Sequence, residues 1–466
     1  MTIVLWSKWT KILLPKASKN HQPNLFHSAL SQILDMNDSL IALTNAIDWN
    51  IFDDNFEKYY SNEGRPAKPI RLMVGLLLLK QLKNLSDEEI VLQWKQNPYF
   101  QYFCGFDELQ IIEPCHSTEL VKFRQRIGKE GMELIFNMSV SLHGKAAEEK
   151  EVIVDTTVQE NNITYPTDGK LAIKIINHLH KIAKQESIQL RRTYMKEIKG
   201  HRISLRFFRH PRKIKKAKSA MKRLRTIAKT LIRDIDRNFS SEQQIAYAED
   251  FYLYMRVLLQ EKSTKNKIYS LHESHAYAVG KGKEHRKWEY GTKASIVTTK
   301  KSGVIIGVSS HRTNEHDSKT LEAALSSATS NRAKPIKEAI CDRGYIGKKE
   351  VNGITISIPG KELKRDTKYQ KEKKREKFRR RAAIEPIIGH LKSDHRMQRN
   401  YLKGFIGDEI NLLLAASAFN LKKWMNNFIR LLFLLKISLI IFVLLQQKQR
   451  EKEKHAQLFL SLFRFR

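Results

Sequence analysis

The stretch EVIVDTTV, residues 151–158, constrains the fold of this chain more than any other. It is short, rich in β-branched residues and almost fully apolar, which predicts a β-strand. A strand without polar alternation is buried on both faces, as in sheets that helices cover from both sides. Two later stretches, KEAIC at 337–341 and ITISIP at 354–359, have the same character, and residues 286–309 predict a hairpin around KKSG. Together these patterns predict an α/β fold.

Helical patterns precede the first strand. Residues 69–96 have a broad apolar face, and SDEE at 86–89 has the capping-box pattern that starts a helix. A second helix is predicted from HSTELVKFRQRIG, residues 116–128, and its polar positions include Lys122, Arg124 and Arg126. A short helix, a turn and a basic helix suit contacts with DNA. The alternative is a small helical domain with a solvated basic face.

The charge of the chain predicts a polyanionic partner. Lys and Arg number 84 against 49 Asp and Glu, a net charge of +35, and nucleic acid is the first candidate for such an excess. Between Ile198 and Arg233 there are 14 Lys or Arg and no acid. A one-sided run of this length repels itself unless phosphates lie nearby, although a solvated face is the alternative. The lysines expected to contact DNA are Lys213, Lys215, Lys216 and Lys218.

Cysteine use and hydropathy bear on the compartment. The three cysteines are isolated, with no CxxC pair, so neither a disulfide framework nor a zinc finger is expected and a reducing, cytoplasmic setting fits. The N-terminus has no continuous apolar region typical of a signal peptide. The apolar run at 428–445 is interrupted by Arg430 and Lys436, and its longest clean piece is shorter than the roughly 20 residues of a membrane span. We therefore expect a buried or partner-packed helix there and no membrane partner.

Three acids are candidates for one site. Asp155 closes the strand V-I-V-D and Asp342 closes A-I-C-D, and side chains at strand ends meet at the edge of an α/β sheet. If Glu385 joined them, the three charges would repel each other unless a divalent cation lay between them. Carboxylates favour Mg²⁺, with Mn²⁺ as the alternative, and two ions could hold a phosphodiester in line. Taken singly, each Asp could instead be a turn former and Glu385 an ion-pair partner.

Side chains around Glu385 are spaced to share one face of a helix. Separations of 3, 4 and 7 residues place four of them within about 60° of arc, so that cations would flank the carboxylate and grip phosphates. Pro386 disfavours the helical conformation at the residue before it. Either the helix kinks there, or it begins there and Arg381 approaches from the preceding segment. The four are Phe378, Arg381, Glu385 and Lys392, and Arg396 continues the row.

On these motifs the chain resembles DDE transposases encoded by bacterial insertion sequences, from about residue 50 to about residue 425. VDTTVQENNITYPTD resembles the region of the first Asp, CDRGYIGKKEV that of the second, and IEPIIGHLKSDHRM that of the Glu. One large group carries Tyr, Arg, Glu and Lys around the Glu. Phe378 stands at the Tyr position here, so a hydroxyl contact is lost. The resemblance implies an RNase H-like mixed sheet with flanking helices, in which Asp155, Asp342 and Glu385 bind two Mg²⁺ ions and are catalytic.

The resemblance also implies a domain organisation and an activity. It divides the chain into an N-terminal segment (1–52), an all-helical DNA-binding domain (53–148), a catalytic domain (149–425) with a basic helical insertion at about 168–266, and a hydrophobic then basic tail (426–466). The expected protein binds double-stranded transposon ends as a homodimer in the bacterial cytoplasm, at the nucleoid. As an endonuclease it would leave a 3′-OH and join that end to target DNA.

Three alternatives stay open from the sequence. The first is an RNase H-like nuclease that cleaves without strand transfer. The second is a catalytically inactive DNA-binding protein derived from a transposase. The third is a basic protein that attaches to a membrane through residues 428–445.

Overall fold

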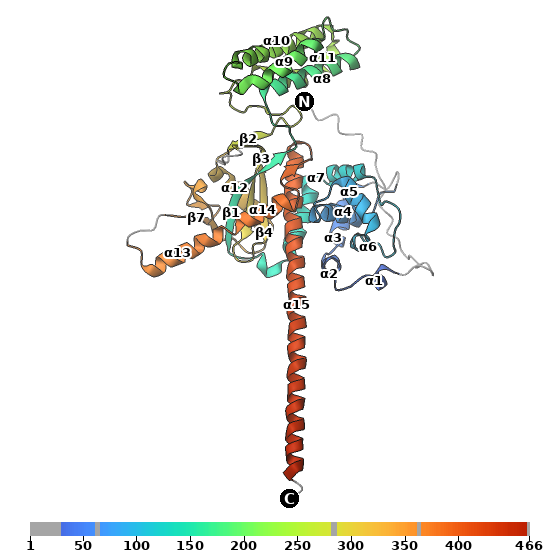
Figure 1. Cartoon of the computed structure of the whole chain (residues 1–466), viewed down its shortest axis with the longest axis vertical. Helices are drawn as coiled ribbons and strands as arrows, with labels where there is room; N and C mark the ends of the chain where they lie inside the picture. Colours follow the sequence, from blue (N-terminus) through green and yellow to red (C-terminus); the bar gives the residue numbers. More distant parts are fainter. Residues whose placement is uncertain (1–28, 61–65, 281–286, 361–364, 464–466) are drawn as a thin grey trace.

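A computed structural model describes residues 29–60, 66–280, 287–360 and 365–463, without the side chains of 449 and 453–463. The first 28 residues of the expected N-terminal segment therefore lie outside the described part. Figure 1 shows three regions: a central body, a separate group of helices above it, and one long helix that extends away below it.

The body is built around a sheet to which the described residues contribute eight strands. The order is β2-β3-β1-β5-β7-β6, with β4 paired to β3 and β8 paired to β1. Strand β1 is antiparallel to β3 and parallel to β5, so the sheet is mixed. The α/β class is thereby confirmed. The strands are β1 (Glu151–Asn161), β2 (Tyr277–Gly280), β3 (Trp288–Thr299), β4 (Ile305–His311), β5 (Glu338–Ile340), β6 (Glu350–Val351), β7 (Ile354–Ser357) and β8 (Arg399–Asn400).

Helices lie on both sides of this sheet. The N-terminal helices form one lobe of the body, α12 and α14 pack against the strands, and α13 extends outward at the lower left (Figure 1). The capping box at residues 86–89 is present at the start of α5, as predicted. The helices of the body are α1 (Leu30–Ile33), α2 (Ser39–Ala46), α3 (Asn50–Phe56), α4 (Ile70–Leu82), α5 (Asp87–Gln96), α6 (Pro98–Phe103), α7 (Ser117–Ser141), α12 (Asp317–Ser330), α13 (Lys368–Arg381) and α14 (Ile384–Ser393), with α15 (Gly404–Phe463) leaving it.

One hydrophobic core joins the N-terminal helices to the sheet. It includes Leu76 of α4, Phe123 of α7, Val154 of β1 and Leu413 of α15, all buried. The first part of α15 packs against α4 and α7 on one side and against β4 on the other. The helical lobe and the sheet therefore form one packed body, with no break in the core at residues 148–149.

A buried carboxylate fixes α15 to the far end of β1. Asp408 is fully buried. Its Oδ1 accepts hydrogen bonds from Asn161 Nδ2 at 2.8 Å and from Asn400 Nδ2 at 2.6 Å, and its Oδ2 lies 2.8 Å from His275 Nε2. Several donors offset the unfavourable burial of a charge. The network holds the C-terminal helix in register with the sheet.

The expected insertion is helical and has a core of its own. Between β1 and β2 the chain forms four helices that stand apart from the body in Figure 1. Their buried side chains, including Ile176, Leu224 and Tyr254, form a hydrophobic cluster separate from that of the body. We call this unit the helical module. It consists of α8 (Asp168–Gln185), α9 (Met195–Ser204), α10 (Ile214–Asn238) and α11 (Ser241–Leu259).

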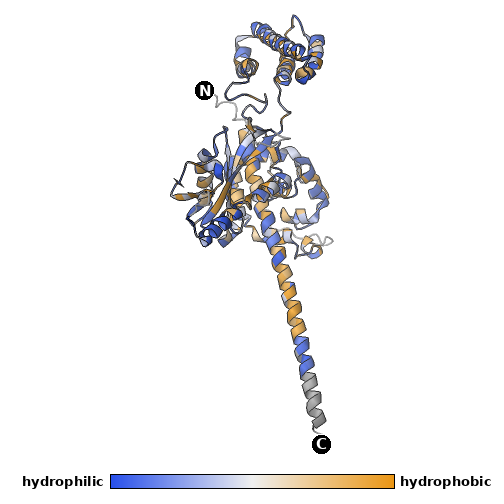
Figure 2. Ribbon diagram, turned by 60° about the vertical axis from the view of Figure 1, so that its left-hand side comes forward, coloured by the Kyte–Doolittle hydropathy of each residue, from blue (hydrophilic) through white to orange (hydrophobic). Residues whose placement is uncertain are grey.

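The distal part of α15 is apolar and exposed. Figure 2 shows it as a hydrophobic stretch that extends from the body into solvent. Leu434 is 53% exposed and Phe442 is 57% exposed. By length and composition alone, α15 could cross a membrane, and it is the one helix among the described residues that meets this test. The expectation of a helix buried within the chain is wrong for 428–445, because nothing else in the described part packs against this segment.

Candidate active site

Asp155 lies in β1, and Asp342 lies two residues after the end of the neighbouring parallel strand β5. The register of β1 and β5 pairs Ile153 with Ile340. The backbone at Asp342 is extended, at φ −84° and ψ −176°, and each aspartate follows the last aligned pair by two residues, so both lie in the same region of the sheet, where the charges of both act on the Cys341 thiol. Neighbouring strands are about 4.8 Å apart. The sheet thus brings together two carboxylates that are remote in the sequence.

Asp155 does not end its strand, contrary to the sequence prediction. Strand β1 continues to Asn161, because β3 pairs with it as far as Glu160 and β8 pairs with its last two residues. Asp155 therefore sits in the interior of the strand, where alternate side chains point to opposite faces. It shares a face with Glu151 and Ile153, whereas Val154 and Thr156 point to the other side.

Asp317 is a further carboxylate at this place that the sequence prediction missed. It is the first residue of α12. Its Oδ1 accepts from Thr156 Oγ1 at 3.0 Å and lies 3.0 Å from Lys293 Nζ. The available signal was an acid at the start of a helix, a position that is usually structural. Here it connects α12 to the strand that carries Asp155.

Gly344 leaves room for two of these carboxylates. A Cβ at this position would lie 3.0 Å from Asp342 Oδ1 and 3.1 Å from Asp317 Oδ2. The Gly344 N–H also donates to Asp342 Oδ1 at 2.8 Å. A side chain at residue 344 would clash with both carboxylates. The glycine in the turn after β5 therefore lets the carboxylates of Asp342 and Asp317 lie on either side of it.

Glu385 belongs to α14, which packs against β1. The neighbouring Ile384 is fully buried and anchors the start of the helix. The Glu385 side chain is 66% exposed, and its Oε1 lies 3.6 Å from Arg381 Nη2. Pro386 occupies the first turn of α14, where the lack of an N–H is tolerated. Glu385 therefore lies beside the strand of Asp155, at the surface and paired with a cation.

The row of residues around Glu385 is divided between two helices. Helix α13 ends at Arg381 and α14 begins at Ile384, so the second alternative at Pro386 is the one observed. Arg396 does not continue the row. It follows the end of α14 in a left-handed conformation, with φ 60°, and its Nη1 donates to Asn84 O at 3.2 Å. The prediction is wrong for Arg396, because the chain turns after α14, whereas Arg381 still reaches Glu385 across the break between the two helices.

The electrostatics of Cys341 link the acids to Arg381. Burial raises the pKa of the Cys341 thiol, and the charges of Asp342 and Asp155 raise it further. Arg381 acts in the opposite direction on the same pKa. The charges of both aspartates and of the guanidinium that pairs with Glu385 thus act on the pKa of one buried thiol.

The aspartate pair fits a hard divalent cation, which takes carboxylate oxygens as ligands. Within the described ranges, no group of three or more His, Cys, Asp and Glu side chains is arranged to hold a metal ion. The structure therefore brings Asp155 and Asp342 together and leaves Glu385 on its neighbouring helix, outside such a group.

Two other predicted DNA contacts near α14 are partly buried. Phe378 of α13 is half-buried. The Nζ of Lys392 lies 4.0 Å from Glu289 Oε2, and Glu289 is buried in β3. Lys392 therefore has a carboxylate partner in the sheet, and only part of its side chain faces solvent.

The prediction that Arg124 of α7 contacts DNA is wrong. It is 3% exposed, and its guanidinium donates to both oxygens of Asp87, at 2.9 and 2.5 Å. Lys80 Nζ lies 2.8 Å from the same carboxylate. Arg124 therefore holds α7 to α5 and offers nothing to DNA. Lys122 is exposed, and the guanidinium of Arg126 stacks over Tyr60 at 4.9 Å from the ring centroid.

The four lysines predicted to bind DNA in the insertion are all exposed. They lie at the start of α10, whose other face is buried in the core of the helical module. Lys213 also lies over the Phe207 ring, 4.8 Å from its centroid. The strong amphipathicity of α10 explains both faces: its apolar residues form the module core, and its lysines gather on the opposite side.

Fold and site together define a transposase-like enzyme, an α/β sheet with paired acids and a basic surface. Residues 28–126 match the family model "Transposase domain (DUF772)", and residues 262–421 match "Transposase DDE domain". The chain is 39% identical over 203 residues to "Uncharacterized protein ORF8 in nfe locus" of Rhizobium meliloti, which covers 42% of this chain and 97% of that protein. No solved structure matches the chain.

The chain belongs to the DDE transposases of insertion sequences. Members of this class bind DNA, act in transposition and depend on a divalent metal ion. The residues between 126 and 262, which include the helical module, lie outside both family matches.

Proposed function

We propose that this transposase cleaves the ends of its own insertion sequence and joins them to target DNA at a site formed by Asp155, Asp342 and Glu385. The observation that carries the proposal is the parallel pairing of β1 with β5, whose last aligned residues, Ile153 and Ile340, each precede one of the aspartates by two positions. Two adjacent carboxylates on an ordered sheet, with a third on the helix that packs against β1, are the donors that a metal-dependent phosphoryl transfer needs.

Two bound Mg²⁺ ions, or Mn²⁺ in their place, would supply charge neutralisation for the phosphodiester. The residues of the chain hold the donors in place. Thr156 and Lys293 hold Asp317 in place, and Gly344 keeps space between Asp317 and the Asp342 carboxylate. Glu385 joins the site when a phosphate takes its place beside Arg381, because both anions compete for one guanidinium.

The chemistry has two balanced steps. In the first, water attacks the phosphorus at the transposon end, the bond to the 3′ oxygen breaks, and a 3′-OH and a 5′-phosphate result. In the second, this 3′-OH attacks a phosphodiester of the target, loses its proton and displaces the target's 3′ oxygen, which leaves as a hydroxyl. Both steps depend on positioning and on charge stabilisation and need no protein nucleophile.

DNA would be held on several surfaces. The exposed lysines of α10 suit the phosphate backbone, as does Lys122 of α7. Arg381 and Phe378 lie at the end of α13, next to Glu385, and would position the cleaved end, as in the subgroup with Tyr, Arg, Glu and Lys around the Glu. We further propose an RNase H-like catalytic domain at 149–425, an N-terminal DNA-binding domain at 53–148, and a homodimer on DNA in the cytoplasm, at the nucleoid.

The test is Asp342→Ala in a cleavage assay with a duplex that carries the end of the element. Loss of one of two aligned carboxylates should lower Mg²⁺-dependent cleavage by at least about 10³-fold, since roughly 4 kcal/mol of barrier corresponds to that factor. Binding of the duplex should stay within about twofold. Glu350→Ala, at an exposed acid on β6 of the same sheet, is the matched control. Undiminished cleavage by Asp342→Ala would overturn the proposal.

Strand transfer is a separate part of the proposal. A nuclease that cleaves without joining would have the same acids. Pre-cut ends with a free 3′-OH, mixed with supercoiled target and Mg²⁺, should give joined products. Cleavage without any joining would favour the nuclease.

A further inference from the structure

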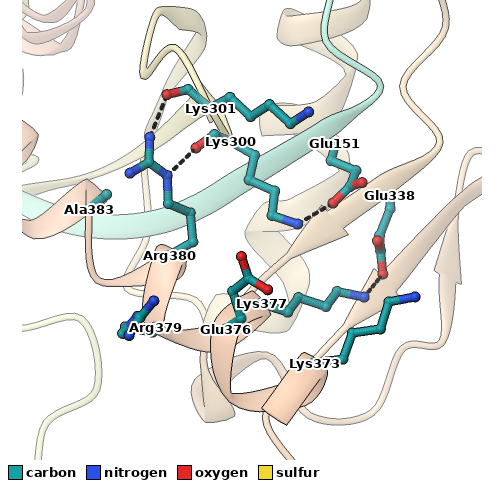
Figure 3. Close-up of a pocket in the computed structure, with 10 residues that line it drawn as sticks. All are labelled: Glu151, Lys300, Lys301, Glu338, Lys373, Glu376, Lys377, Arg379, Arg380 and Ala383. Carbon is teal, nitrogen blue, oxygen red and sulfur yellow. Dashed lines mark hydrogen bonds and ion pairs between the residues drawn. The ribbon is translucent and has the colours of Figure 1, made fainter. Parts of the chain in front are cut away.

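A basic pocket lies where β1 and β5 begin, four residues before Asp155 and Asp342. It has a volume of about 630 Å³ and is lined by the first residues of β1 and β5, the β3–β4 turn and one side of α13 (Figure 3). Glu151 and Glu338, at those two strand starts, are paired in the parallel register. Each lies four residues before an aspartate of the site, and within β1 the side chains of Glu151 and Asp155 point to the same face.

This spacing sets the distance between the pocket and the acids. Four residues of β-strand span about 13 Å. Phosphates of one strand of B-DNA rise about 3.4 Å per nucleotide along the helix axis. Because the backbone also winds around the axis, successive phosphates lie farther apart than this rise, and a span of about 13 Å between the aspartates and the pocket corresponds to roughly two nucleotides of one strand.

The walls of the pocket are held by specific contacts. Lys300 Nζ lies 2.5 Å from Glu151 Oε2, and Lys377 pairs with Glu338. Arg380 donates from Nε to Lys300 O at 3.0 Å and from Nη2 to Lys301 O at 2.5 Å. These contacts, drawn in Figure 3, tie α13 to the β3–β4 turn and to the sheet. The pocket is thus a formed part of the surface.

The pocket keeps an excess of positive charge. Six of its lining residues are Lys or Arg and three are Glu, so its net charge is +3. Two of the acids are neutralised by Lys300 and Lys377. In the described part of the chain, Lys301, Lys373 and Arg379 have no carboxylate partner, and all three are exposed. In Figure 3 they line the pocket without a dashed contact from their side chains, and Glu376 lies near them.

We propose that this pocket binds backbone phosphates of the DNA strand that occupies the active site, about two nucleotides from the scissile phosphate. The inference rests on the proposed function, because the register with Asp155 and Asp342 sets the distance. Lys373 and Arg379 make the contacts, and Arg380 keeps α13 in place. Phosphate contacts position DNA without reading its sequence. The pocket would therefore set where the strand lies relative to the active site, and sequence specificity would come from other surfaces.

The test removes two pocket charges in the full chain. Lys373→Ala/Arg379→Ala is compared with Lys368→Ala/Lys371→Ala, which removes the same charge from the same helix outside the pocket. The logarithmic salt slope of affinity for an end duplex should fall by about 1.8 for the pocket pair, at about 0.9 for each lost contact. The control pair should leave it unchanged. Equal slopes for the two pairs would overturn the inference.

A second measurement needs no variant. Neutral methylphosphonates are placed one at a time along the cleaved strand of the duplex. The wild-type protein should lose about fivefold or more in affinity when the first, second or third phosphate from the scissile bond is replaced, and Lys373→Ala/Arg379→Ala should not. A loss equally large in that variant would contradict the pocket contact. Since both readouts are binding, they stand apart from Asp342→Ala cleavage, which tests the proposed function alone.

Discussion

Arg381 Nη2 lies 3.6 Å from Glu385 Oε1, across the break between α13 and α14. The two residues are four apart in sequence and belong to different helices. The ion pair is partly solvated and therefore weak, so a phosphate can replace the carboxylate on the guanidinium. This arrangement couples the third acid of the proposed site to the arrival of DNA.

Arg381→Ala should slow single-turnover cleavage about tenfold or more, because the guanidinium that positions the phosphate beside Glu385 is lost. A factor of ten corresponds to about 1.4 kcal/mol of activation free energy. Arg381→Lys should recover part of the rate, since it keeps the charge and loses the planar fork. A Mg²⁺ titration of the rate distinguishes positioning from folding: the Ala variant should need a different metal concentration for half-maximal activity. An unchanged rate for Arg381→Ala would exclude this role.

Replacing Lys213, Lys215, Lys216 and Lys218 with Ala should lower the salt slope of DNA affinity by about 3.6, at about 0.9 per phosphate contact. These side chains are exposed on α10, so the fold should be unaffected. The control removes Lys448 and Lys452, at the distal part of α15, and is compared per charge removed. If the slope per charge is the same in both variants, the α10 lysines form only a solvated face.

Arg124→Ala should destabilise the body and leave the DNA salt slope unchanged. Removing one partner of a buried ion pair is unfavourable by about 3–5 kcal/mol, because the other charge stays buried without compensation. Lys122→Ala, two residues earlier on the exposed side of the same helix, should lower the salt slope of DNA affinity and leave the stability of the body unchanged. Thermal unfolding and a salt titration of each variant measure the two effects, and a stable Arg124→Ala with a reduced slope would contradict the burial argument.

The Asp87 carboxylate should make the body sensitive to acid. Burial alone would raise its pKa, but the hydrogen bonds and charges of Arg124 and Lys80 lower it from 3.8 to about 2. A pKa that is lower in the folded state stabilises the fold above about pH 4, and this contribution is lost as the pH falls toward 2. It amounts to about 2 kcal/mol. Denaturant unfolding between pH 5 and pH 2 should show this loss in the wild type and a flatter profile in Asp87→Asn.

The two separate cores should give two unfolding transitions in calorimetry. Leu224→Ala, in the core of the helical module, should shift one transition, and Leu76→Ala, in the core of the body, should shift the other. Both leucines are fully buried, so each change should destabilise its own unit by about 2–5 kcal/mol. A single transition moved equally by both variants would show that the two units unfold together.

Local signals in the sequence predicted much of this fold. The capping box at 86–89, the KKSG hairpin and the basic amphipathic α10 each depend on residues close together in the chain, and all three are present. The place of Asp342 after an apolar strand is likewise a local pattern, and β5 ends two residues before it.

The features that the sequence did not reveal depend on distant partners. Strand β1 is longer than its apolar stretch because β3 and β8 supply pairing to Asn161. Arg124 is buried because Asp87, 37 residues earlier, lies opposite it. Asp317 joins the acids through Thr156, which is 161 residues away in the chain. Spacing along one segment carries no information on such pairs.

The exposed length of α15 has a practical consequence for handling the protein. The last buried residue of this helix is Met425, and the apolar part beyond it has nothing to cover it in the described chain. In aqueous buffer, molecules of the full chain should associate through the exposed apolar part of α15. The mass measured by light scattering would then be that of these aggregates, and the number of subunits bound to DNA could not be read from it. A chain that stops at Arg430 keeps every buried side chain of the body and should allow the number of subunits on each DNA end to be counted.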